Sequence, residues 1–280
     1  MGAGMEIVDR SVEIEGLSVR YHEAGTGFPL IFIHGGGPGA SGWSNFHRNI
    51  PELAKTHRVI AVDLPGYGES TKLTLKEPRI AFYSRIVCRL MDALNLPKAN
   101  FVGNSLGGAT SVMTALLEPE KVNKLVLMGP AVSFALTTPF PSEGLKHMMN
   151  YYREPGPSFE KMKRFVSVMV ADQSLISDEI VKDRFEASVR EDILEHPPGP
   201  PSAESPFEPL WQDLHKIKHK TLVLWGREDR VIPVDSALIF LSQMPNAQLH
   251  IFPQCGHWVQ WEKADEFNQL VTLFLGSETK

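Results

Sequence analysis

Gly103-Asn104-Ser105-Leu106-Gly107-Gly108 decides the fold, because it places a serine between glycines where an apolar run ends and a helical pattern begins. A strand that turns sharply into a helix needs unusual backbone angles and close neighbours, which glycine permits. Residues 100–102 are strand-like, and 109–117 continue as a mostly apolar helix. The pattern therefore predicts a nucleophilic serine, Ser105, at the start of a helix whose free N–H groups face a developing oxyanion.

A serine hydroxyl becomes a good nucleophile when a histidine takes its proton and a carboxylate orients that histidine. In folds with this turn, the carboxylate and then the histidine follow the serine along the chain. Asp229 follows the apolar run 221–225, and His257 follows the run 248–252. Loops at the carboxyl ends of parallel strands are where such folds bind ligands. We therefore expect Ser105, Asp229 and His257 to form a catalytic triad.

Other candidates for these roles are weaker. Glu228 is adjacent to Asp229 but would point the other way, and Asp235 lies at the start of the next predicted helix, where capping is its ordinary role. Cys255 as a nucleophile would lack the strand-to-helix turn. Most of the ten histidines lie in polar or helical surroundings, whereas His34 and His257 lie among glycines in loops after strands.

The second glycine-rich segment is His34-Gly35-Gly36-Gly37-Pro38-Gly39, which follows the apolar run 30–33. An oxyanion hole in this fold takes one N–H from the residue after the nucleophile and one from the loop after the third strand. Leu106 would supply the first, and Gly36 or a neighbour the second. A nucleotide-binding loop is disfavoured, because no Gly-x-Gly-x-x-Gly opens a helix here and no Lys-Ser/Thr follows.

Alternating strand and helix patterns predict an α/β sandwich with a mostly parallel sheet. Between residues 129 and 211 this rhythm stops, and a helix-rich stretch containing Met148, Met149, Met162 and Met169 takes over. We interpret residues 132–209 as a helical cap inserted after the sixth strand, and 1–131 with 210–280 as the core; 196–201 would be a stiff proline-rich loop. The expected strands are a hairpin over 12–21, then 30–33, 59–62, 100–103, 125–128, 221–225 and 248–252; the expected core helices are 43–54, 80–94, 106–117, 235–243 and 265–274.

Composition indicates a soluble enzyme with a small-molecule substrate. The 280 residues, 42% hydrophobic, suffice for one large α/β domain with an insertion. A net charge of −5 without a basic block argues against nucleic acid and anionic membranes as partners, and no apolar run approaches the ~18 residues of a membrane-spanning helix. Cys88 and Cys255 form neither a disulfide framework nor a metal cluster, which suits the cytoplasm. We expect no metal and no cofactor.

Three further motifs lie near the predicted site residues: Gly-Trp-Ser-Asn-Phe at 42–46, Trp-Gly-Arg-Glu-Asp-Arg at 225–230 and Cys-Gly-His-Trp-Val-Gln-Trp-Glu at 255–262. Together with segments 34–39 and 103–108, they closely resemble the meta-cleavage product hydrolases. Members of this family have the α/β-hydrolase fold and cut carbon–carbon bonds in vinylogous 1,5-diketones formed by aromatic ring cleavage. The resemblance covers nearly the whole chain.

The resemblance implies a substrate with a dienol and a carboxylate at one end. Arg184 matches the family's cap arginine, whose planar guanidinium suits a carboxylate. Without the resemblance, Arg184 would be interpreted as a surface helix arginine like Arg190. Phenylalanine and methionine side chains of the cap would hold the departing acyl group. The residues implied to line the polar half of the site are Gly35, Gly36, Asn45, Asn104 and Trp258.

The expected reaction is hydrolysis of a 2-hydroxy-6-oxo-hexa-2,4-dienoate, with an aryl substituent favoured. The products would be 2-hydroxypenta-2,4-dienoate and a carboxylic acid such as benzoate, and relatives imply a homo-oligomer. A carboxylesterase or aminopeptidase of the same fold would share the triad without needing Arg184, and a non-catalytic receptor would have a broken triad. Dehalogenases and epoxide hydrolases place an aspartate at the turn, so Ser105 excludes their chemistry.

Overall fold

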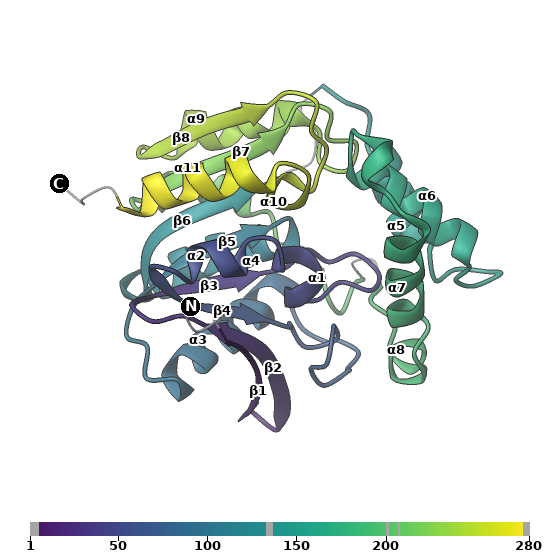
Figure 1. Ribbon diagram of the computed structural model, residues 1–280, viewed down its shortest axis with the longest axis horizontal. Coiled ribbons are helices and arrows are strands. Elements are labelled where there is room, and N and C mark those ends of the chain that lie inside the picture. Colours follow the sequence, from purple (N-terminus) through teal and green to yellow (C-terminus); the bar gives the residue numbers. More distant parts are fainter. Residues whose placement is uncertain (1–5, 133–136, 200–201, 207, 277–280) are drawn as a thin grey trace, which may run out of the picture.

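The computed structural model describes residues 6–132, 137–199, 202–206 and 208–276 (Figure 1). Both ends of the expected core and parts of the expected cap, including 200–201 of the proline-rich loop, therefore lie outside the described residues. In the described part, eight strands form one sheet in the order β1-β2-β4-β3-β5-β6-β7-β8. The pairs β1–β2 and β2–β4 are antiparallel, and the other pairs of described strands are parallel. The strands are β1 (Ile7–Ile14), β2 (Leu17–Ala24), β3 (Phe28–Ile33), β4 (His57–Val62), β5 (Ala99–Asn104), β6 (Val122–Met128), β7 (Lys220–Gly226) and β8 (Ala247–Phe252).

The central strands are apolar on both faces, because helices cover both. Leu30 and Phe32 of β3 pack into one core, whereas Ile31 and Ile33 pack into the other. Each fully buried side chain of this size contributes about 1.5–3 kcal/mol to folding. Helices α1 (Gly42–Phe46), α2 (Ile50–Leu53) and α11 (Ala264–Gly276) cover one face, and α3 (Arg79–Ala93), α4 (Leu106–Leu117) and α9 (Ala237–Gln243) cover the other.

The sequence prediction of one helix over 43–54 is wrong, because α1 and α2 are separate. Pro51 lacks an N–H, and within a continuous helix its ring would clash with the carbonyl of residue 47. It is instead accommodated in the first turn of α2, after Asn49. The other expected core elements are present, with ends that differ by a few residues. None of the helices in the described ranges is long and apolar enough to span a membrane.

In the described residues between β6 and β7, four α-helices stack together beside the sheet in Figure 1, at the side of α1 and α10 (Val259–Glu262). The expected helical insertion after the sixth strand is therefore present. Serine hydroxyls cap three of these helices by accepting a backbone N–H from the first turn. The four are α5 (Glu143–Asn150), α6 (Phe159–Met169), α7 (Asp178–Ser188) and α8 (Glu191–Glu195).

Backbone hydrogen bonds join the end of α6 to the loop after β8. The Trp258 N–H donates to the Met169 carbonyl at 3.1 Å. The Glu262 carboxylate, at the end of α10, accepts the N–H groups of Ala171 and Asp172 on one side and of Gly256 on the other. One carboxylate thus ties the helical insertion to the segment that carries His257.

Candidate active site

Ser105 lies at a sharp turn between β5 and α4, as the sequence predicts. Its backbone has φ 50° and ψ −109°, a conformation that costs a non-glycine residue about 1–3 kcal/mol. Its N–H donates to the Met128 carbonyl at 2.8 Å. A Cβ at Gly103 would lie 2.4 Å from the Gly107 carbonyl oxygen, and one at Gly107 would lie 2.0 Å from that of Ile33. Only glycine fits at these two positions.

Asp229 and His257 form a buried pair behind Ser105. The His257 Nδ1 lies 2.7 Å from Asp229 Oδ2, and the other carboxylate oxygen accepts the N–H groups of Val231 and Ile232 at 2.8 and 2.9 Å. Because a carboxylate only accepts, Nδ1 carries the hydrogen and Nε2 has the free lone pair. Nε2 can therefore take a proton from a hydroxyl in the cavity that Ser105 and His257 both line.

The alternative residues are occupied elsewhere. Glu228 accepts the backbone N–H of Cys255 and pairs with Arg227, so it faces away from His257, as expected. Asp235 binds the N–H groups of residues 137 and 138. Its side chain therefore joins the helical insertion to the core, and the expected capping of its own helix is not observed. Cys255 is fully buried, which raises the pKa of its thiol and disfavours the thiolate.

The loop after β3 presents an N–H beside the nucleophile. His34 Nδ1 lies 2.8 Å from the Gly35 carbonyl and Nε2 lies 3.0 Å from the Leu64 N–H, so Nδ1 donates and the imidazole is neutral. Burial lowers the pKa of His34, which favours this neutral form. Among the described residues, the N–H groups of Gly36 and Leu106 have no acceptor, and the two residues are in contact. These are the expected oxyanion donors.

Arg184 of α7 is a buried cation that no carboxylate of the described residues neutralises. Its Nη2 donates to the Pro38 carbonyl at 3.0 Å, and its guanidinium lies 4.7 Å from the centre of the Trp258 ring. Its buried Nε has no hydrogen-bond partner within the described ranges. Burial lowers the pKa of Arg184 to about 10, so the group stays charged at neutral pH. A buried charge without a counter-ion is costly, which favours binding of an anionic ligand here.

Two asparagines complete the polar side of the cavity. Asn45 accepts the Gly35 N–H at 3.3 Å. Asn104 donates to the backbone carbonyls of Met128 and His257, while its buried Oδ1 has no partner in the described protein. That oxygen is available to accept a hydrogen bond from a ligand hydroxyl.

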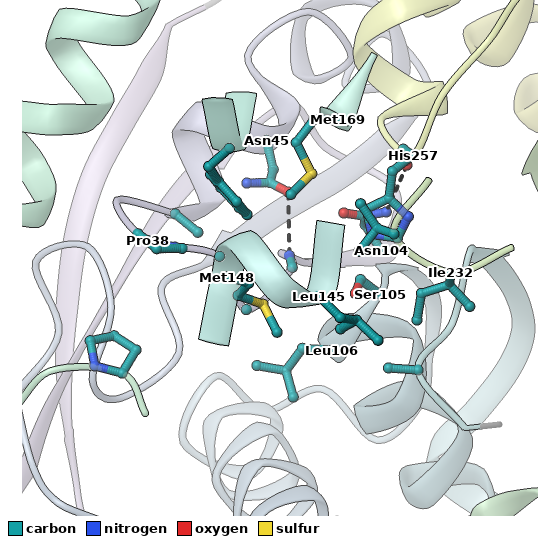
Figure 2. Close-up of a pocket in the computed structure, with 18 of the residues that line it drawn as sticks. Pro38, Asn45, Asn104, Ser105, Leu106, Leu145, Met148, Met169, Ile232 and His257 are labelled. Carbon is teal, nitrogen blue, oxygen red and sulfur yellow. Dashed lines mark hydrogen bonds between the residues drawn. The ribbon is translucent and has the colours of Figure 1, made fainter. Parts of the chain in front are cut away.

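Nine of the ten residues predicted for the site line this one cavity, part of which Figure 2 shows, and the tenth, Asp229, hydrogen-bonds His257. In the view of Figure 2, Asn45 lies above Ser105, Leu106 and Leu145 lie below it, and Ile232 lies to its right. Of the four methionines in the helical insertion, Met148, Met149 and Met169 line the cavity, whereas Met162 is fully buried and packs in the core. The apolar lining includes Ala131, Leu145, Met148, Met149, Phe165, Met169, Val231 and Ile232.

Comparison with known proteins agrees with this geometry. The alpha/beta hydrolase fold family matches residues 29–264. The 2-hydroxy-6-oxo-6-phenylhexa-2,4-dienoate hydrolase of Burkholderia cepacia is 43% identical over 275 residues, 95% of each protein. The crystallised meta-cleavage product hydrolase from Pseudomonas fluorescens IP01, a serine-to-alanine mutant complexed with acetates, is 35% identical with a TM-score of 0.83, over 95% of this chain and 97% of that one. The chain belongs to the meta-cleavage product hydrolase family.

A second relative of similar sequence identity is named for a different substrate. The 2-hydroxy-6-oxononadienedioate/2-hydroxy-6-oxononatrienedioate hydrolase of Comamonas testosteroni is 42% identical over 277 residues, again 95% of each protein. The name of the Burkholderia cepacia relative thus specifies a phenyl end, and that of the Comamonas testosteroni relative specifies a second carboxylate.

Gly129 is a site residue of this hydrolase that sequence reasoning missed. It follows β6 with φ +45°, and a Cβ there would lie 3.1 Å from the His257 ring and 3.2 Å from Asp229 Oδ2. Its N–H donates to the Leu224 carbonyl on β7. The signal in the sequence was a glycine directly after a strand, at the sheet edge that also carries Ser105.

We expect Gly129→Ala to lower kcat by at least 10-fold, because the methyl group would displace the His257 ring and strain a left-handed backbone. Steady-state kinetics of the purified variant measures this. Gly199→Ala is the matched control, since Gly199 also lines the cavity but a Cβ there has no neighbour closer than 3.9 Å. Equal activity of the two variants would contradict the assignment.

We expect the free energy of unfolding to fall as the pH drops below about 6.5, the ordinary pKa of histidine. Burial lowers the pKa of folded His34, so in acid the unfolded chain binds a proton that the folded protein does not, a loss of up to about 1.4 kcal/mol per pH unit. Urea denaturation between pH 7.5 and 5.5 should show a shallower dependence for His34→Gln than for wild type. Identical slopes would assign the effect to His47 and His57, whose pKa values burial also lowers.

Proposed function

We propose that this enzyme hydrolyses the C5–C6 bond of 2-hydroxy-6-oxo-hexa-2,4-dienoates that carry an apolar substituent at C6. The products are 2-hydroxypenta-2,4-dienoate and a carboxylic acid, such as benzoate from a phenyl substrate. The named relatives support this reaction class, and the site supports it independently. The triad itself would equally suit an esterase.

The observation that carries the proposal is the buried, unneutralised guanidinium of Arg184 in the same cavity as Ser105. A substrate carboxylate there would supply the missing counter-charge and accept two N–H bonds from a planar fork. Trp258 covers the face of the guanidinium, and Asn104 Oδ1 offers an acceptor for the C2 hydroxyl. An ester of a simple alcohol needs none of these groups.

The first stage of the proposed mechanism is ketonisation of the dienol. The C2 hydroxyl proton leaves and C5 gains a proton, with His257 assisting the transfer, while Arg184 and Asn104 hold the C1–C2 end. Cleavage requires this step, because electrons released at C5 are stabilised only when a conjugated C2 ketone can take them up as a dienolate.

In the second stage, Ser105 attacks the C6 ketone while His257 Nε2 takes the serine proton and Asp229 stabilises the resulting imidazolium. The N–H groups of Gly36 and Leu106 bind the oxyanion. Collapse breaks the C5–C6 bond, with the electron pair passing through the enone to the C2 oxygen, and forms an acyl-serine. The C2 oxygen of the departing dienolate takes up the proton that the His257 imidazolium gives up, so the product leaves as the dienol and His257 is neutral again. Water then attacks this ester, again with His257 as the base, and releases the acid.

The acyl group would occupy the apolar side of the cavity, near Leu145 and Ile232 (Figure 2). An aryl ring buried there gains hydrophobic free energy, whereas a second carboxylate would lose its hydration. We therefore favour the phenyl-type substrate over the dioate-type substrate of the second relative.

We further propose that residues 132–209 act as the cap that closes this cavity, and that the enzyme is a cytoplasmic homo-oligomer. The first point is supported by Leu145, Phe165 and Arg184, which reach the cavity from α5, α6 and α7. Size-exclusion chromatography with light scattering tests the oligomeric state.

We expect Ser105→Ala to abolish release of the carboxylic acid, by at least 10³-fold, while leaving the affinity for the dienoate within about threefold. Acid formation is measured by chromatography and binding by the absorbance of the bound dienolate. Substantial turnover by the variant would disprove the nucleophile assignment.

We expect phenyl-ended dienoates to exceed carboxyl-ended ones at least 10-fold in kcat/KM, since the acyl side of the cavity is apolar. The loss of dienolate absorbance measures both.

In the same assay Arg184→Gln should raise KM for the phenyl substrate about 10- to 100-fold but change hydrolysis of 4-nitrophenyl acetate little. Arg190→Gln, at the surface of the helical insertion, is the control for Arg184→Gln and should leave KM unchanged. A preference of the wild-type enzyme for the carboxyl-ended substrate would contradict the prediction that the acyl group binds on the apolar side of the cavity.

A further inference from the structure

The glycine-rich loop after β3 is held by its carbonyl groups. Four successive carbonyls each accept a hydrogen bond. Two donors are local, His34 Nδ1 to Gly35 and the Ala40 N–H to Gly37. The other two come from distant segments, the Tyr67 hydroxyl to Gly36 and Arg184 to Pro38. Three consecutive glycines would otherwise give this segment wide conformational freedom. The bonds therefore fix which way each peptide unit faces.

Tyr67 is the one of these donors that reaches the loop from the segment after β4. Its hydroxyl donates to the Gly36 carbonyl at 3.1 Å, and its own N–H donates to the Leu64 carbonyl at 2.9 Å. The ring is buried and lies edge-on to the His34 imidazole, with 5.0 Å between the ring centres. Tyr67 is thus rigidly held and contacts the residue whose N–H faces the oxyanion.

Arg79, the first residue of α3, lines the same cavity as Tyr67. Burial raises the pKa of the Tyr67 phenol, and the nearby Arg79 guanidinium acts in the opposite direction. A cation beside a hydroxyl polarises its O–H bond and strengthens the hydrogen bond that the hydroxyl donates, here to Gly36. Arg79 thus supports the contact of Tyr67 with the loop.

We propose that Tyr67, supported by Arg79, is a positioning residue for the oxyanion hole. Without the hydrogen bond from Tyr67, the peptide unit after Gly36 could rotate and turn the Gly36 carbonyl oxygen toward the developing oxyanion. The partial negative charge of that oxygen would then destabilise the oxyanion. The Gly36 N–H belongs to the peptide unit that contains the Gly35 carbonyl, which His34 holds, whereas Tyr67 holds the next unit. With both units fixed, the Gly36 carbonyl stays turned away from the charge while the Gly36 N–H faces it. The contribution is made in the transition state, because the ground-state ketone is bound mainly through its other end.

The test is Tyr67→Phe, which removes one oxygen atom and keeps the ring. We expect kcat to fall about 3- to 10-fold, the effect of one lost hydrogen bond, with KM changed less than twofold. Two substrates are assayed: 2-hydroxy-6-oxo-6-phenylhexa-2,4-dienoate and 4-nitrophenyl acetate. Both require an oxyanion at the attacked carbonyl, so both should lose a similar factor. In stopped-flow experiments with the dienoate, the ketonisation phase should keep its rate while the cleavage phase slows.

Tyr83→Phe is the matched control, since Tyr83 is a buried tyrosine that makes no hydrogen bond to the loop in the described protein. Its kcat should stay within 1.5-fold of wild type. Arg79→Met should lower kcat on its own, and adding it to Tyr67→Phe should cause little further loss, because Arg79 acts through the phenol. Unchanged kcat in Tyr67→Phe, an equal loss in Tyr83→Phe, or multiplicative losses in the double variant would each overturn the inference.

The dienoate arm rests on the proposed function, whereas the ester arm does not. If the wild type hydrolyses the ester but not the dienoate, the proposed substrate class is wrong, and the Tyr67→Phe ratio on the ester still decides the role of Tyr67.

Discussion

The site depends on the close approach of two backbones at Gly107, where α4 packs directly against the end of β3. Any side chain at Gly107 would push the helix away from the Ile33 carbonyl. Because the helix lies this close, the Leu106 N–H and the Gly36 N–H come from distant parts of the sequence and yet face one point. Ser105 is presented at that point by the strained turn, and the strain is sustained by packing on both sides.

The sequence predicted those parts of the site that depend on chain order. Ser105, Asp229 and His257 could each be assigned because they follow apolar strands, and parallel strands bring their carboxyl ends to one edge. Gly129 and Tyr67 were not predicted, because their roles depend on contacts with residues that are distant in the sequence. Local sequence patterns do not indicate such contacts. The break at Pro51 was missed because the apolar spacing on either side of it still fitted one helix.

The two cap arginines illustrate the limit of local reasoning. Arg190 pairs at the surface with Glu69 and Asp192, whereas Arg184, a short distance along the chain, is buried without a carboxylate. Both lie in polar, helical sequence, and only the resemblance to a family distinguished them. What separates them physically is the surface that each meets: Arg184 meets the loop after β3 at Pro38 and the ring of Trp258.

The Glu262 carboxylate restricts how the helical insertion can move. It holds the N–H groups of Ala171 and Asp172 and also that of Gly256, next to His257. Swinging the end of α6 outward would therefore pull on the catalytic histidine segment itself. If the helical insertion opens without disturbing the His257–Asp229 geometry, it must pivot about the end of α6 that Glu262 holds. The displacement of the insertion is then largest near α8. Substrate admission and the integrity of the proton-transfer pair are mechanically linked through this carboxylate and the hydrogen bond from the Trp258 N–H to the Met169 carbonyl.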